Sequence, residues 1–420
     1  MALASKLHFV GVGGAGMAPL AALCCLSGRR VSGSDCLMNS KMEHLQTLGI
    51  AIFSGHSKDA VPDDTECLIY SSAVPPENPE RKKAFELGIP QLCRGAALAE
   101  FCCDYKRIIA VSGAHGKSSI TALISHILKE NNFNSGYMIG ADFNGAENYS
   151  SGNGDIFVTE ADESDGTHKL LEPWCGVIPN YDPDHAWSVG GETQLKKNFR
   201  EFADRSKNLL YYGYRDVDDF CSGRDGRIDV VPEDFTYAGF FGYEAANALI
   251  AVKCCMMLGC PEQSAEAAAA GFPGIARRMS IRLTAENVTV IEDYAHHPTE
   301  VHNSINLLRH RYKDHHLRIV FQPHRYARLE KFFDGFVSEL QKADSLYIAP
   351  VFAAWSEYGN VDSSMLAAEC GGVAVSSDWN SVADAVLADI PDDRPLLVAV
   401  LGAGDINRIF PCLEEKLKKN

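Results

Sequence analysis

The chain has 420 residues, of which 46% are hydrophobic and 22% are charged, and this length predicts about two to four domains at roughly 100–200 residues per domain. There are 39 Lys and Arg against 55 Asp and Glu, so the formal net charge is −16, and no run of basic residues stands out. Nucleic acid is therefore not expected as a partner, because its binding requires clustered cations.

Cysteines and the N-terminus indicate the compartment. The 14 cysteines include adjacent pairs such as Cys24-Cys25 and Cys254-Cys255 rather than spaced CxxC units, which predicts reduced thiols. The first apolar run breaks into glycines after about four residues, and no uncharged apolar stretch reaches ~18 residues. We expect a cytoplasmic protein without signal peptide or membrane span. The 35 glycines matter because glycine loops can bind phosphate through backbone N–H groups.

Three sections of the chain share one pattern, in which an apolar run leads into glycines or turn residues and then into a helical pattern. They begin near residues 7, 107 and 288. This order is typical of parallel α/β domains. We place domain boundaries at 103/104 and 272/273, which gives domains 1–103, 104–272 and 273–420. Ligands of such sheets bind beyond the carboxyl ends of the strands, where every motif below lies.

The first motif is a glycine loop at residues 11–16, GVGGAG, between a predicted strand and a predicted helix. It matches GxGxxG, and Asp35 ends the next strand about where a ribose-binding acid is expected. Glycines permit close backbone approach, and a helix N-terminus favours an anion. The loop predicts a nucleotide diphosphate, and it leaves open whether the ligand is a dinucleotide or another nucleotide.

The second motif is a shortened phosphate loop at residues 113–119, GAHGKSS. Lys117 can reach the β- and γ-phosphates of a nucleotide, and the Ser118 hydroxyl can bind Mg²⁺. The strict pattern has a glycine where this chain has Val111. We expect ATP as the ligand.

Two polar loops follow later strands of the same section. They are EADESD at residues 160–165 and DPDH at residues 182–185. Mg²⁺ prefers oxygen ligands, so carboxylates at strand ends beside a phosphate loop predict a magnesium site.

The third section has DYAHHP at residues 293–298 and QPHRYAR at residues 322–328. Arg325 and Arg328 are expected to form a guanidinium pair suited to a carboxylate. This predicts a second substrate that carries a carboxylate. Zinc is not favoured for His296 and His297, because no cysteine or acid at suitable spacing completes a set of ligands.

Together these motifs resemble the Mur ligase family over nearly the whole chain. The elements that carry the resemblance are, in order, HFVGVGGAGM, SSA at Ser71, GAHGKS, EADESD, NYDPDH, DYAHHPTE, FQPHRYAR and GAGD at Gly402. The resemblance implies a bacterial enzyme of peptidoglycan synthesis with a Rossmann-like N-terminal domain for a UDP-sugar, a central P-loop ATPase domain and a Rossmann-like C-terminal domain for an amino acid. Within the family, GVGGAGM, EADESDG and DYAHHPTE indicate the member that joins L-alanine to UDP-N-acetylmuramate through an acyl phosphate, with ATP and Mg²⁺.

The resemblance also implies roles for individual residues. The catalytic residues are expected to be Lys117, His185, His324, Arg325 and Arg328. ATP is expected to contact Gly113, Ala114, His115, Gly116, Lys117, Ser118, Ser119, Asn247, Arg278 and Asp293. The UDP-sugar is expected to contact Gly13, Gly14, Ala15, Gly16, Met17, Asp35, Ser71, Ser72, His115, Asp162 and Ser164. Tyr294, His296 and His297 are expected on the amino-acid side, and Ser118, Glu160 and His185 at the metal.

Several positions depart from the family pattern, and three other functions stay open. Trp187 replaces an acid after the metal-binding histidine, Asn247 lacks a preceding histidine, and Ala276 and Met279 replace a lysine and an aromatic residue. We expect altered packing of the nucleotide. The alternatives are a sibling ligase that attaches a preformed peptide during cell-wall recycling, a dinucleotide-dependent oxidoreductase, and a UDP-sugar binding protein without activity. The sequence sets neither the oligomeric state nor the choice among L-alanine, glycine and L-serine.

Overall fold

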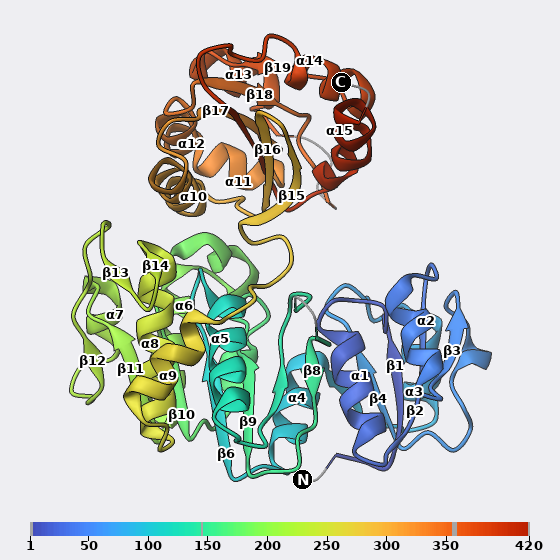
Figure 1. Cartoon of the computed structure of the whole chain (residues 1–420). Coiled ribbons are helices and arrows are strands. Elements are labelled where there is room, and N and C mark those ends of the chain that lie inside the picture. Colours follow the sequence, from blue (N-terminus) through green and yellow to red (C-terminus); the bar gives the residue numbers. More distant parts are fainter. Residues whose placement is uncertain (1–2, 144–145, 355–358, 419–420) are drawn as a thin grey trace. The chain divides into compact units, whose positions relative to one another are not determined.

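The computed structural model describes residues 3–143, 146–354 and 359–418 (Figure 1). The chain divides into two compact units, Met1–Phe240 with Glu244–Ile275, and Phe241–Tyr243 with Ala276–Asn420. No helix within the described ranges has the length and apolar character needed to cross a membrane.

The first unit begins with a parallel sheet of five strands in the order β3-β2-β1-β4-β5. Its strands are β1 (Lys6–Val10), β2 (Arg30–Asp35), β3 (Ala51–Ser54), β4 (Cys67–Tyr70) and β5 (Gln91–Cys93). The connecting helices are α1 (Met17–Leu26), α2 (Ser40–Thr47), η1 (Lys58–Ala60), α3 (Pro79–Glu86) and α4 (Arg94–Cys102). Side-chain oxygens of Asn39 and Asn78 cap α2 and α3, which fixes where these helices start.

A second sheet in the same unit has seven strands in the order β12-β11-β10-β6-β9-β7-β8. Only β8 pairs antiparallel. The strands are β6 (Arg107–Val111), β7 (Gly136–Met138), β8 (Tyr149–Ser150), β9 (Ile156–Glu160), β10 (Cys175–Ile178), β11 (Asn208–Tyr212) and β12 (Arg227–Ile228). The helices are α5 (Lys117–Glu130), η2 (Thr167–Leu170), η3 (Pro183–Val189), α6 (Glu192–Arg205), α7 (Arg215–Phe220), α8 (Tyr243–Met257) and α9 (Glu262–Ala270), and β13 (Thr236–Tyr237) pairs with β14 (Phe240–Phe241).

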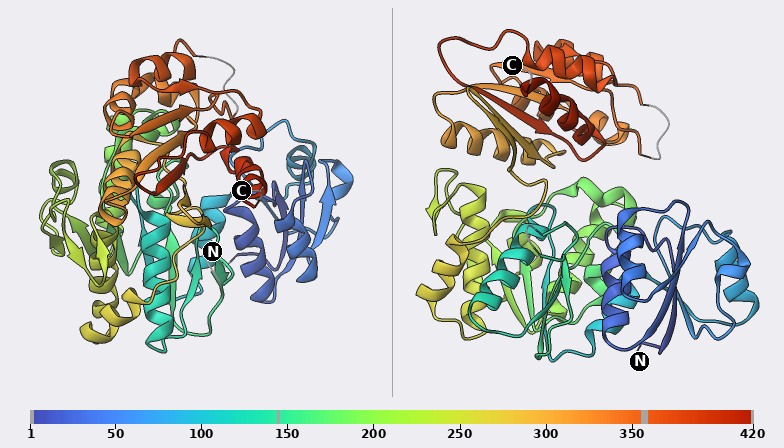
Figure 2. Two further views of the ribbon diagram at one scale, coloured as in Figure 1. Left: turned by 45° about the horizontal axis from the view of Figure 1, so that its top comes forward. Right: turned by 45° about the vertical axis from the view of Figure 1, so that its right-hand side comes forward.

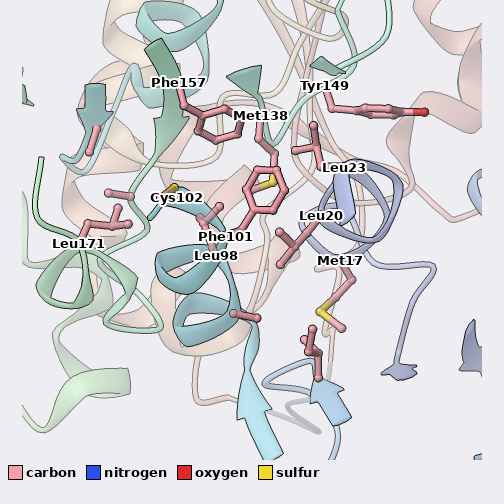
Figure 3. Packing of buried hydrophobic residues seen from close by; sticks show 14 of the residues in the cluster. Met17, Leu20, Leu23, Leu98, Phe101, Cys102, Met138, Tyr149, Phe157 and Leu171 are labelled. Carbon is pink, nitrogen blue, oxygen red and sulfur yellow. The ribbon is translucent and has the colours of Figure 1, made fainter. Parts of the chain in front are cut away.

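The two sheets of the first unit share one hydrophobic core (Figure 3). Leu20 and Leu23 of α1 and Phe101 of α4 meet Phe157 of β9 and Met138 of β7 in this core. The ring centroids of Phe101 and Phe157 are 5.5 Å apart. Truncation of such a buried aromatic side chain typically costs about 3–5 kcal/mol. This core therefore holds the loops at the ends of both sheets in one body.

The second unit is a six-stranded sheet in the order β15-β16-β20-β17-β18-β19, with only β15 antiparallel. Its strands are β15 (Ser280–Ala285), β16 (Val288–Asp293), β17 (His316–Phe321), β18 (Ser345–Ile348), β19 (Val373–Ala374) and β20 (Leu396–Leu401). Its helices are α10 (Pro298–Arg311), α11 (Tyr326–Lys331), α12 (Phe333–Leu340), α13 (Ser363–Cys370), α14 (Trp379–Leu387), η4 (Ile406–Arg408) and α15 (Ile409–Leu417).

Both faces of this sheet are covered by helices (Figure 2). Leu317, Ile319 and Phe321 of β17 pack on one face with α10 and α12, while Val320 packs on the other face with α14 and α15. This alternation follows from the two-residue period of a strand. The predicted α/β class with parallel sheets is confirmed. The predicted boundaries stay predictions: residues 103 and 104 lie between α4 and β6, and residues 272 and 273 follow α9.

Candidate active site

The first glycine loop connects β1 to α1. Gly11 has φ +82°, and a Cβ atom there would lie 3.0 Å from Cβ of Ser71, so both conformation and space require glycine. Asp35, at the end of β2, accepts a hydrogen bond from the Gly13 N–H at 2.9 Å. The structure thus brings the loop, Asp35 and Ser71 together, as the sequence predicts for one ligand site. The contact of Asp35 with a ribose stays a prediction, and the observed contact fixes the loop.

The phosphate loop connects β6 to α5 in the same unit. Gly116 has φ +83°, and a Cβ atom there would lie 3.0 Å from Oδ1 of Asn247 on α8. Asn180, which follows β10, clamps the loop, because its Oδ1 accepts from the His115 N–H and its Nδ2 donates to the His115 carbonyl, both at 2.9 Å. Sequence reasoning did not single out Asn180. The only signal was its place in the NYDPDH motif directly after a strand.

Lys117 is held in place at the start of α5. Its Nζ donates to the carbonyl of Gly113 at 2.7 Å and to the two carboxylate oxygens of Glu163 at 2.8 and 3.0 Å. Burial raises the pKa of Glu163 to about 7, although the charge of Lys117 opposes this. Burial alone would lower the pKa of Lys117, but the nearby carboxylates, chiefly Glu163, raise it above its ordinary value. The lysine is therefore charged and fixed beside the loop.

Two predicted metal ligands, Ser118 and Glu160, lie next to each other. Glu160 ends β9, and its Oε1 accepts from the Gly140 N–H at 2.6 Å. Burial raises the pKa of Glu160, while hydrogen bonds from Gly140 and from the Ser118 hydroxyl and the charge of Lys117 lower it. The backbone of His185 lies in η3, and its side chain is outside the described residues.

The acidic loop, defined as residues 160–166, carries an excess of negative charge. Asp162 is nearly buried, and although burial would raise its pKa, Lys117 and Arg94 lower it to about 2. Asp165 pairs with Arg94. When ionised, the four carboxylates of this loop outnumber the two cations that face them. Of the predicted ligands, Glu160 and the Ser118 hydroxyl offer neighbouring oxygen atoms, the ligand type that Mg²⁺ prefers, so these two residues fit the ion, whose binding stays a prediction.

The segment that leads into β15 carries a strained pair of residues around Arg278. Arg277 and Met279 have φ +61° and +47°, a conformation that costs of order 1–3 kcal/mol for each such residue. The guanidinium carbons of Arg277 and Arg278 lie 4.8 and 5.3 Å from the ring centroid of Tyr294. Two cations of the second unit thus lie close to one aromatic ring.

Asp293 ends β16 in a buried polar cluster. The Ser304 hydroxyl donates to its Oδ2 at 2.9 Å. Nη1 of Arg278 lies 3.9 Å from Oδ1 of Asp293 and 3.3 Å from Oε1 of Glu300. Burial raises the pKa of Asp293 to about 6, although Arg278 opposes this. Two residues that were predicted to contact ATP, Arg278 and Asp293, are thus neighbours.

The residues predicted on the amino-acid side gather at the ends of β16 and β17. The His296 N–H donates to Glu300 at 3.0 Å, and burial lowers the pKa of His296 to about 4, so its imidazole is neutral near pH 7. Its ring lies 5.9 Å from that of His324, whose Nδ1 is 3.1 Å from Nη1 of Arg328.

Two further predicted residues of this section occupy helix starts. His297 is 2% exposed, and its Nδ1 accepts from the Thr299 N–H at 3.3 Å, which caps α10. Arg325 precedes α11 with φ +69°. Their predicted contacts with a substrate, and the pairing of Arg325 with Arg328, stay predictions.

Comparisons with known proteins give the family. The family described as "Mur ligase family, catalytic domain" matches residues 6–106, and "Mur ligase, glutamate ligase domain" matches residues 277–404. The chain is 33% identical to the UDP-N-acetylmuramate--L-alanine ligase of Sulfurihydrogenibium sp. and 30% identical to that of Syntrophomonas wolfei, and covers 98% and 97% of these proteins with 99% of its own length.

Solved structures show the same fold. The UDP-N-acetylmuramate-alanine ligase MurC of Thermotoga maritima aligns with a TM-score of 0.81 at 24% identity, over 99% of both chains. A murein peptide ligase of Psychrobacter arcticus aligns with a TM-score of 0.70 at 17% identity, also over 99% of both chains. From the two matching family domains and the full-length relatives, we conclude that the chain belongs to the Mur ligase family.

Proposed function

We propose that this chain is an ATP-dependent ligase that joins L-alanine to UDP-N-acetylmuramate through an acyl phosphate in the cytoplasm. Two relatives that are 33% and 30% identical over 99% of the chain are named UDP-N-acetylmuramate--L-alanine ligase. The observation that carries the proposal is the pair of glycine loops in one unit, with Lys117 fixed beside the second loop by Glu163. A dinucleotide-dependent oxidoreductase would have no use for Lys117.

The chemistry divides between the two units. We assign the UDP-sugar to residues 1–103, ATP to residues 104–272 and the amino acid to residues 273–420. Bound Mg²⁺, held by Ser118, Glu160 and His185, would neutralise phosphate charge. In the first step the lactyl carboxylate oxygen bonds to the γ-phosphorus and the bond to ADP breaks, and Lys117 lowers the repulsion between these anions.

The second step forms the amide. The amine of L-alanine attacks the acyl carbonyl, phosphate leaves, and the nitrogen loses a proton to water. We assign the amino-acid side to Tyr294, His296, His297, His324, Arg325 and Arg328. The planar guanidinium of Arg328, which lies beside His324, suits a carboxylate.

A phosphate-release assay with a panel of acceptors tests the proposal. Each reaction contains ATP, Mg²⁺ and UDP-N-acetylmuramate with L-alanine, glycine, L-serine or a tripeptide. L-alanine should give the highest kcat/KM, although pockets discriminate a methyl group by only about 1–3 kcal/mol. Preference for the tripeptide would identify the sibling ligase instead, and binding of UDP-N-acetylmuramate without any turnover would identify a binding protein.

A further inference from the structure

Arg94 lies between two loops of the proposed site, and no motif assigns it a function. It is the first residue of α4, directly after β5, and its side chain is 16% exposed. On one side it contacts the first glycine loop, and on the other it contacts the acidic loop.

The contact of Arg94 with the first glycine loop explains why residue 16 is a glycine. Gly16 has φ −94°, which any residue can adopt, so its backbone does not require glycine. A Cβ atom at Gly16 would, however, lie 3.0 Å from both Cδ and Nη1 of Arg94. Glycine at this position leaves room for the guanidinium.

The second contact is with two carboxylates. Nη2 of Arg94 donates to Oδ2 of Asp165 and lies 3.7 Å from Oδ2 of Asp162. Oδ1 of Asp165 accepts from the N–H and the hydroxyl of Thr167 at 3.0 and 2.6 Å. A Cβ atom at Gly95 would overlap the Thr167 hydroxyl, so α4 contacts the acidic loop through Arg94 and the residue directly after that loop through Gly95.

The acidic loop in turn holds the lysine of the phosphate loop. Glu163 lies between Asp162 and Asp165 in the sequence, and its carboxylate accepts both hydrogen bonds from Lys117. A movement of Arg94 therefore shifts the segment that fixes Lys117. The contacts form a continuous connection from Gly16 through Arg94 and the acidic loop to Lys117.

We propose that Arg94 is a positioning residue that couples the first glycine loop to Lys117, so that a UDP-sugar bound at the first loop changes the affinity for ATP. The inference rests on the proposed function, in which these loops bind the two substrates. Such coupling is reciprocal and typically changes affinity about 5–150-fold.

Calorimetry of the full chain tests the coupling. The affinity for the ATP analogue AMPPCP with Mg²⁺ is measured with and without saturating UDP-N-acetylmuramate. In the wild type we expect a change of about fivefold or more. Arg94→Lys keeps the charge but lacks the planar fork, and Gly16→Ala keeps Arg94 but displaces it. In both variants UDP-N-acetylmuramate should change the affinity for AMPPCP by less than about twofold. The affinity for AMPPCP without UDP-N-acetylmuramate should stay within about twofold of wild type.

An arginine outside the proposed loops gives the matched control. Arg29 pairs with Asp104, with Nη2 2.8 Å from Oδ2, and neither residue belongs to the proposed binding loops, so Arg29→Lys should retain the coupling. At saturating substrates Arg94→Lys and Gly16→Ala should lower kcat about tenfold, since small misplacements of reacting groups are costly, and KM for ATP should no longer respond to bound UDP-N-acetylmuramate.

The outcomes separate this inference from the proposed function. Coupling that persists in Arg94→Lys and Gly16→Ala would overturn the role of Arg94, and so would a wild type that binds both ligands independently. A wild type that does not bind UDP-N-acetylmuramate would overturn the proposed function and this inference together.

Discussion

His168 is buried against aromatic side chains beside the proposed site. It lies in η2 and is fully buried, and within the described part of the chain neither ring nitrogen has a partner at full hydrogen-bond distance, although the Asp162 backbone interacts weakly with the ring. Its ring centroid is 5.0 Å from that of Phe199 and 6.2 Å from that of Phe202. The substitution His168→Phe should therefore stabilise the protein, since an unsatisfied buried donor costs about 1–3 kcal/mol.

The gain should depend on pH. Burial lowers the pKa of His168 from 6.5 to about 4, so the folded state keeps the ring neutral while the unfolded state binds a proton below pH 6.5. The free energy of unfolding of the wild type is therefore unaffected by this proton above pH 6.5, and it decreases as the pH falls from 6.5 toward 4. Linkage with these two pKa values gives a loss of about 2 kcal/mol between pH 7 and pH 5.

Urea unfolding at pH 7 and pH 5 measures the effect. His168→Phe should exceed the wild type in free energy of unfolding at pH 7, and the difference should grow by about 2 kcal/mol at pH 5. Phe199→Leu is the control, because it alters the same core without removing a titratable group and should cost the same at both pH values. A difference between His168→Phe and wild type that does not change with pH would refute the reasoning.

Four other substitutions test the site and the second unit. Lys117→Met should lower kcat about 10²–10³-fold in the phosphate-release assay, as loss of a charge-stabilising donor does, with an unchanged circular dichroism spectrum. Glu160→Gln should raise the Mg²⁺ concentration for half-maximal activity at least about tenfold, since ligand loss weakens a metal site; an unchanged Mg²⁺ titration would exclude Glu160 as a ligand. Asn180→Ala removes both hydrogen bonds to the His115 backbone and should raise KM for ATP and lower the free energy of unfolding by about 1–3 kcal/mol. Glu292→Gln weakens the pairing of a buried carboxylate with two arginines and should cost about 1.5–3 kcal/mol in urea unfolding.

The sequence predicts the fold class because parallel strands that are covered on both faces consist of short apolar runs, and these runs end in polar loops. It also places the glycine loops and the acidic loop at strand ends, and the structure brings Lys117, Ser118 and Glu160 together there. These side chains follow neighbouring strands β6 and β9, so a local pattern was enough to predict their proximity.

Contacts between distant segments were not predictable in the same way. Glu163 is 46 residues from Lys117, and Asn180 is 65 residues from His115; only the packed sheet decides that they meet. Arg94 lies outside every motif, and its contacts depend on how α4 packs beside the acidic loop. His297 shows a signal that was overlooked: a polar residue directly before a proline at the first position of a helix is typical of an N-cap.

The most direct test of the central claim is the product of the complete reaction. Purified protein is incubated with ATP, Mg²⁺, UDP-N-acetylmuramate and L-alanine, and phosphate release and the mass of the UDP-sugar product are measured, with each substrate omitted in turn. We predict one phosphate released per UDP-N-acetylmuramoyl-L-alanine formed, no product when any substrate is omitted, and product formation about 10²–10³-fold slower with Lys117→Met. ATP turnover without an amide product, or saturable NADH binding in the absence of ATP binding, would contradict it.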